Sequence, residues 1–128
     1  MLIITMTCYS NSNRSENFNI KITQMDEETN LEILHELANS GHIGAQYELG
    51  IKYAEGKGVK QDSIKAKDWY EKAALQGDVD SQALLGHMYY AVEGIPQDYI
   101  KAKEWFQKSC DNGYQIGCES VEKNKNTW

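Results

Sequence analysis

Residues 42–77 read HIGAQYELGIKYAEGKGVKQDSIKAKDWYEKAALQG, and residues 78–113 read DVDSQALLGHMYYAVEGIPQDYIKAKEWFQKSCDNG. Aligned without a gap, these two stretches of 36 residues carry the same residue at 14 positions. An internal period of this length is typical of repeat proteins, in which each unit packs against its neighbours. The period continues into both flanks, so we expect a repeat array over 26–125, with half units at 26–41 and 114–125.

Each unit is expected to form two helices. Ala45, Leu49 and Tyr53 recur at helical spacing, and a second set follows in the later half of the unit. An aspartate stands before the second helix, where it can cap free backbone amides, and a glycine follows it, where left-handed backbone is favoured. Gly50 and Gly86 recur within the first helix, which predicts a close approach of two helices. The sequence therefore predicts an all-α stack of antiparallel helix pairs, held together by the positions that both units share.

The repeated motifs also resemble a known family. AQYELG at 45–50, GKGV at 56–59 and WYEKAA at 69–74 resemble the Sel-one-like repeat, a relative of the tetratricopeptide repeat. The second unit departs from that pattern at Val92, where the family usually has glycine, and at 109–110, where Ser-Cys replaces Ala-Ala. The resemblance covers about three quarters of the chain. It implies a right-handed α/α superhelix (a solenoid) of two full and two partial helix-pair repeats, whose members mostly serve as adaptors and binding surfaces.

Composition and charge narrow the choice of partners. The chain has 128 residues, enough for one domain, and a net charge of −6. A surface of that sign repels phosphate, so we expect no nucleic acid partner. No apolar run approaches the ~20 residues that a membrane span needs. The three histidines lie in no ligand spacing with the cysteines, so we expect neither a metal ion nor a cofactor.

Two of the three cysteines occupy related positions of the repeat. In the 36-residue register, Cys110 and Cys118 fall where the end of one helix faces the start of the next across a turn. Their spacing also resembles the disulfide of the cysteine-rich branch of secreted bacterial Sel-one-like repeat proteins. We expect a disulfide between them. The alternative is a pair of buried thiols in a reducing cytosol, because free cysteine packs well in a core.

The first 25 residues lie outside the repeat array. The apolar stretch MLIITMT is followed by Cys8 and a polar stretch, which looks like the end of a lipoprotein signal with lipidation at Cys8. No basic residue precedes the apolar stretch, and the residues before Cys8 differ from the usual signal. Together with a disulfide, this pattern favours the bacterial envelope, where the protein would be periplasmic, lipid-anchored or secreted. The alternative is a cytoplasmic protein with an ordinary N-terminus.

The positions that differ between the two units indicate a binding surface. In the first helix of each unit they share one face, opposite much of the packing stripe. By analogy with the superfamily, that face lines the inner groove, where apolar anchors with an acidic rim are typical of a surface that binds a protein or a peptide. An alternative is that the chain's own segment FNIKI at 18–22 fills the groove. The candidate residues are Glu48, Ile51, Lys52, Glu55, Asp80, Leu84, His87, Met88 and Ile116.

One short motif near the end of the chain resembles a catalytic motif. Ser120 and Lys123 match the S-x-x-K pattern of penicillin-binding proteins and serine β-lactamases. The companion S-D-N and K-T-G motifs are absent, and we find no catalytic constellation. We therefore expect a non-enzymatic interaction module, either an adaptor or an immunity-type protein. The alternative is a β-lactam-binding protein or weak β-lactamase, which resemblance to the cysteine-rich branch would allow.

Overall fold

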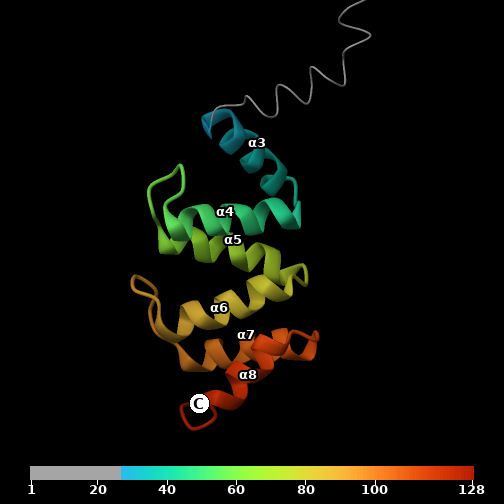
Figure 1. Ribbon diagram of the computed structural model, residues 1–128, viewed down its shortest axis with the longest axis vertical. Helices are drawn as coiled ribbons and strands as arrows, with labels where there is room; N and C mark the ends of the chain where they lie inside the picture. The colour runs from blue at the N-terminus through green and yellow to red at the C-terminus, as the bar shows by residue number, and fades with distance from the viewer. Residues whose placement is uncertain (1–26) are drawn as a thin grey trace, which may run out of the picture. The chain divides into compact units, whose positions relative to one another are not determined.

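The structure is a computed structural model that describes residues 27–128. This part of the chain forms six α-helices and no strand, so the all-α prediction is confirmed for it. The possible lipidation site Cys8 and the segment 18–22 lie outside the described residues. The helices are α3 (Glu27–Asn39), α4 (Ile43–Glu55), α5 (Ser63–Leu75), α6 (Val79–Ala91), α7 (Tyr99–Asp111) and α8 (Gln115–Lys123) (Figure 1).

Residues 33–128 form one compact unit, and every contact described below lies within it. Each helix from α4 to α7 packs against the helix that follows it in the chain, which gives the layered arrangement in Figure 1. The pairs α4–α5 and α6–α7 correspond to the two predicted full repeats. Within the described range, no helix is both long enough and apolar enough to cross a membrane.

The helix ends follow the capping pattern of the sequence. Asp62 accepts hydrogen bonds from two backbone amides in the first turn of α5, both at 3.0 Å. Asp98 accepts one from the first turn of α7, also at 3.0 Å. Gly77 and Gly113 follow these helices with φ angles of 99° and 90°, in the left-handed region that favours glycine. The predicted caps are therefore confirmed in both repeats.

The departure at Val92 changes how α6 ends. Helix α4 ends on Gly56 with φ 69°, whereas α6 ends on Val92 in an extended conformation with φ −106°. A valine is strained in the left-handed region, so the second loop keeps one left-handed glycine, Gly94 with φ 86°, which corresponds to Gly58 with φ 71° in the first repeat. Ile95 then enters the core with 7% of its surface exposed. The corresponding residue of the first repeat, Val59, is half-buried, so the loop residue at this position is more deeply buried in the second repeat.

The two glycines within helices allow close packing against an aromatic ring. A Cβ atom built on Gly50 would lie 2.4 Å from Cε1 of Tyr70, and one on Gly86 would lie 2.7 Å from Cδ1 of Phe106. Both rings are buried, with 4% and 5% of their surfaces exposed. The prediction of a close approach at these glycines is confirmed, and each ring belongs to the second helix of the same repeat.

A pair of hydrogen bonds ties each repeat to the next. Gln46 Nε2 donates to the backbone oxygen of Ala38 at 3.0 Å, and Gln82 Nε2 donates to that of Ala74 at 3.1 Å. The Gln82 oxygen in turn accepts a hydrogen bond from Asn112 at 3.1 Å. Both glutamines are buried, so these bonds satisfy polar groups that would be costly to leave unpaired.

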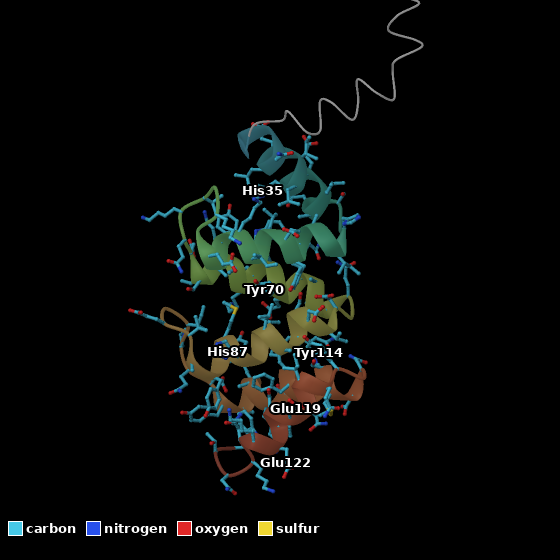
Figure 2. All side chains as sticks on the ribbon, in the orientation of Figure 1. His35, Tyr70, His87, Tyr114, Glu119 and Glu122 are labelled. Carbon is cyan, nitrogen blue, oxygen red and sulfur yellow. A yellow bond between two sulfur atoms is a disulfide. The ribbon has the colours of Figure 1, made fainter. Side chains whose placement is uncertain are left out.

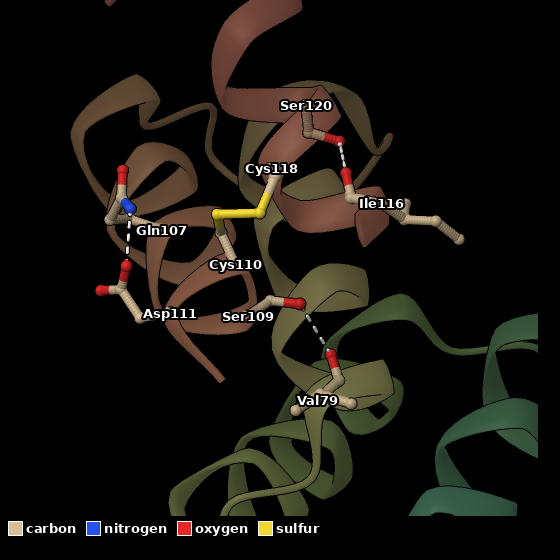
Figure 3. The surroundings of a disulfide bond; sticks show 8 residues. All are labelled: Val79, Gln107, Ser109, Cys110, Asp111, Ile116, Cys118 and Ser120. Carbon is tan, nitrogen blue, oxygen red and sulfur yellow. Dashed lines mark hydrogen bonds between the residues drawn. A yellow bond between two sulfur atoms is a disulfide. The ribbon is translucent and has the colours of Figure 1, made fainter. Parts of the chain in front are cut away.

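Between α7 and α8, a disulfide takes the place of the glutamine hydrogen bond that joins the earlier repeats. Cys110 occupies the register position of Ala74, Cys118 that of Gln82, and the two are joined with their Cα atoms 4.5 Å apart (Figure 3). The predicted disulfide is therefore confirmed. Gly117 allows α8 to approach α7 closely, because a Cβ atom there would lie 2.8 Å from the backbone nitrogen of Cys110.

Two shared positions, Ile64 and Ile100, do not hold the stack together, which corrects the prediction for them. Trp69 and Trp105 are half-buried, and a lysine one turn later lies over each ring, 4.3 and 4.5 Å from its centre. Ile64 and Ile100 are 56% and 74% exposed. The tryptophans also take part in packing, because Trp105 lies against the hydrophobic core and the Trp69 ring contacts His35 of α3 with ring centres 5.8 Å apart. Nothing in the structure explains why the two isoleucines recur.

Candidate binding groove

A hollow of about 300 Å³ lies where side chains of α4, α6, α7 and α8 meet, and we call it the groove pocket. It brings together residues from both full repeats and from the final helix, including His87 and Tyr114, which Figure 2 labels. Its lining residues are Tyr47, Asp80, Ala83, Leu84, His87, Phe106, Tyr114, Ile116 and Ser120.

Apolar and aromatic side chains of α4, α6, α7 and α8 line the groove pocket. Leu84 packs against the core and also lines the pocket, so its position is fixed by the fold. Ile116 is 53% exposed, which leaves much of its apolar surface open to a partner. Phe106 and Tyr47 add aromatic surface, and Tyr47 packs against Tyr70 with their ring centres 5.9 Å apart. The pocket therefore combines a rigid apolar wall with one exposed apolar side chain.

The charge of the groove pocket is set by carboxylates. Hydrogen bonding to the Asp80 carboxylate raises the pKa of Tyr114 above its ordinary value. Burial raises the pKa of Tyr47, and the charges of Asp80, Asp78 and Glu48 raise it further. A raised tyrosine pKa means that the surroundings disfavour an additional negative charge. The rim of the pocket is therefore negative.

The sequence of the full repeats matches a described family. The model of the Sel1 repeat matches residues 43–78 and 79–114, which together make up more than half of the chain. The protein belongs to the Sel1 repeat family. The matched Sel1 repeats begin and end one residue after the units predicted from the internal period.

Solved Sel1-type structures resemble this chain. A Sel1 repeat protein from Oxalobacter formigenes is 37% identical over 77% of this chain and 29% of its own length, with a TM-score of 0.72. A protective antigen of uropathogenic Escherichia coli strains, described as displaying an SLR fold, is 35% identical over 71% of this chain and 20% of its own, with a TM-score of 0.68. Cysteine rich protein B of Helicobacter pylori is 29% identical over 75% of this chain and 72% of its own, with a TM-score of 0.69.

The chain is shorter than two of these Sel1 relatives. It spans about a fifth of the E. coli antigen and less than a third of the O. formigenes protein. It spans most of the H. pylori protein. A comparison with curated proteins finds no match.

Four of the predicted groove residues come together in the groove pocket. Asp80, Leu84, His87 and Ile116 all line it. The four predicted residues of α4 do not. Two of these are exposed and two are half-buried; they are Glu48, Ile51, Lys52 and Glu55.

Met88 was predicted to be an exposed anchor, and this is wrong. Only 5% of its surface is exposed, and it belongs to the hydrophobic core. The reason is that α6 packs against α5 on one side and α7 on the other. Seven of the thirteen residues of α6 are buried, whereas four of the thirteen residues of α4 are buried. The face of α6 that is open to solvent is therefore narrower than that of α4. The face inferred from helical spacing is too wide for a helix with two neighbours.

Three aromatic residues of the groove pocket were not predicted from the sequence: Tyr47, Phe106 and Tyr114. A signal existed for Tyr114, because it occupies the N-cap position of α8, where the earlier Sel1 units have His42 and Asp78. Those two side chains each accept a backbone amide hydrogen bond, whereas Tyr114 makes no capping bond. Its side chain instead lines the groove pocket, where hydrogen bonding to Asp80 raises the pKa of Tyr114.

Ser120 of the S-x-x-K motif also lines the groove pocket. Its hydroxyl donates a hydrogen bond to the backbone oxygen of Ile116 at 2.8 Å (Figure 3). This is a common bond for a serine inside a helix. It holds the proton that a general base would have to remove from a nucleophile. Among the described residues, no group of three or more histidine, cysteine or carboxylate side chains could hold a metal ion.

A larger hollow of about 570 Å³ lies along α7 and beside Trp128. Tyr99 and Ile100 supply apolar lining. Lysine and carboxylate side chains also line the hollow, so it carries charges of both signs. Trp128 is held by a hydrogen bond from its indole nitrogen to the backbone oxygen of Val121 at 3.1 Å. The sequence does not predict this hollow, because the hollow depends on where Trp128 lies relative to α7.

Proposed function

We propose that this Sel1 repeat protein is a non-enzymatic module that binds a protein or a peptide in the groove pocket. The observation that carries the proposal is the exposed apolar side chain of Ile116 beside Leu84, with the Asp80 carboxylate in the same pocket. Such a combination of an apolar anchor and a charged rim is typical of protein interaction surfaces. Sel1 repeats generally serve protein interaction, which agrees with this assignment.

We also infer how the repeats are organised along the chain and what the protein does in the cell. Helices α3 and α8 belong to partial repeats at 26–41 and 114–125, which flank the two full repeats. A net charge of −6 favours protein partners over nucleic acid. In the cell the module acts as an adaptor, or as an immunity-type protein that blocks a toxin by covering it.

The substitution Ile116→Asp tests this function. Placing a carboxylate on the exposed anchor should abolish recovery of the partner from the cells that produce the protein, because the apolar contact is lost and charge is buried. Ile64→Asp is the matched control, since Ile64 is similarly exposed at 56% and does not line the groove pocket. Circular dichroism checks that both variants remain folded. Equal recovery of the partner by both variants would contradict the proposal.

We also propose that the protein works outside the cytoplasm, in the bacterial envelope. The Cys110–Cys118 disulfide supports this location, because disulfides persist in oxidising compartments. The likeness to cysteine rich protein B of Helicobacter pylori agrees with it. A lipid anchor at Cys8 is part of this proposal.

The intact mass of the native protein, measured without reductant, tests the location. We expect a species with the disulfide formed and with the N-terminus processed or lipidated at Cys8. A full-length and fully reduced species would contradict both the disulfide in the cell and the export of the protein.

A further inference from the structure

The groove pocket has a specific polar centre. Among the described residues that line it, Asp80 is the one carboxylate, and none is a lysine or an arginine. Tyr47 and Tyr114 line the pocket together with Asp80. Hydrogen bonding to Asp80 raises the pKa of Tyr114, and burial followed by the charge of Asp80 raises the pKa of Tyr47. The Asp80 carboxylate and the two tyrosines therefore form the polar centre of the pocket.

Asp80 has bonding capacity that the fold does not use. A carboxylate offers about four acceptor positions, and the Tyr114 hydroxyl takes up one of them. The neighbouring Asp78 differs, because its carboxylate caps α6 by accepting the backbone amide of Ser81 at 2.9 Å. Asp78 and Glu48 add negative charge around the pocket. The site thus has an available acceptor, a negative field and aromatic walls.

These three properties match a guanidinium group. A guanidinium carries several donors in one plane, pairs with carboxylates and stacks on aromatic faces. Tyr47 and Tyr114 add aromatic surface to the lining of this pocket, and aromatic surface is favourable for a guanidinium. The exposed surface of Ile116 lies beside this position and suits an apolar residue next to the arginine in the bound segment.

We propose that the groove pocket receives an arginine side chain from an extended segment of the partner, with its guanidinium on Asp80 and a neighbouring apolar residue on Ile116. This inference rests on the proposed function and names the chemistry of the segment that the groove takes. The partner is therefore a protein that presents a basic residue flanked by apolar ones.

A pair of synthetic peptides tests the proposal on the full-length oxidised protein. The probes are acetyl-Leu-Arg-Leu-amide and its citrulline counterpart, which has nearly the same shape without the charge. Binding is followed by the backbone amide signals in nuclear magnetic resonance spectra. We expect the arginine peptide to shift amides at 80–87 and 114–120, and the citrulline peptide to bind about tenfold or more weakly, because a charge-assisted hydrogen bond is lost.

Protein variants complete the test. Asp80→Asn should reduce the affinity for the arginine peptide to that for the citrulline peptide, whereas Glu93→Gln makes the same charge change in an exposed loop outside the pocket and should have no effect. Equal binding of both peptides, shifts outside the pocket or no saturable shift would overturn the arginine site. Pocket amides that respond to Lys21→Gln, but to neither peptide, would assign the pocket to the chain's own residues 18–22 and also overturn it.

The outcome separates this inference from the proposed function. If both peptides bind equally in the groove pocket, the arginine site is wrong while the pocket remains a peptide-binding surface. If Ile116→Asp leaves partner recovery intact, the proposed function itself fails, whatever the peptides do.

Discussion

The substitution Gly50→Ala should destabilise the protein by about 1–3 kcal/mol, as expected for an extra methyl group forced into a packed core. In the interior of an exposed helix the same change is stabilising by about 1 kcal/mol. Here the new methyl group would lie 2.4 Å from the Tyr70 ring, which has 4% of its surface exposed and is enclosed by the core. Tyr70 would have to move, and with it the contact between α4 and α5. The free energy of unfolding, measured in denaturant, checks this prediction.

Gly44→Ala provides the matched control on the same helix. A Cβ atom on Gly44 would come no closer than 3.4 Å to the His42 ring, at an exposed position. The stability of this variant should be unchanged or slightly higher. If both variants unfold at the same denaturant concentration as the original protein, the close approach of α4 and Tyr70 is wrong.

Loss of the disulfide should release α8 from the stack. A double substitution of Cys110 and Cys118 by serine removes a cross-link that closes a short loop, which contributes roughly 2–3 kcal/mol on the loop-entropy model. Helix α8 depends on this link, because it has nine residues, no side-chain N-cap, and Gly117 as its buried residue. Its neighbour in the stack is α7. We expect faster hydrogen exchange at the amides of α8, and little change at those of α5.

The same variant should also bind a groove ligand more weakly. Tyr114, Ile116 and Ser120 form one wall of the groove pocket and move with α8. The substitution Cys8→Ser is the control, because it removes a thiol outside the repeats and should leave the exchange of α8 unchanged. Unaltered exchange in α8 after loss of the disulfide would show that packing at Gly117 and the hydrogen bond of Trp128 hold this helix without it.

The sequence was most informative where both repeats make the same contact. The aspartate caps, the left-handed glycines and the close approaches at Gly50 and Gly86 each recur in register, so the repeat itself reveals them. The disulfide was predictable for the same reason, since Cys110 and Cys118 stand where Ala74 and Gln82 make a contact one repeat earlier.

The groove was harder to predict because it depends on features that do not recur. Met88 is buried because α6 has a helical neighbour on each side, whereas helical spacing alone placed it on the open face. Tyr114 stands where the earlier repeats have a capping side chain, but it makes no capping bond and lines the pocket with Asp80. Ile64 and Ile100 show the opposite case, in which identity between repeats does not mean burial.

The central claim is that a partner protein occupies the groove pocket, and a cross-linking experiment in the native cell tests it most directly. A photoreactive residue is placed at His87, which is exposed and lines the pocket, and in a control at Glu93, which is exposed in the loop after α6. We predict one protein adduct from position 87 that is absent from position 93 and is lost when Ile116→Asp is added. No adduct from position 87, or the same adduct from both positions, would contradict the claim.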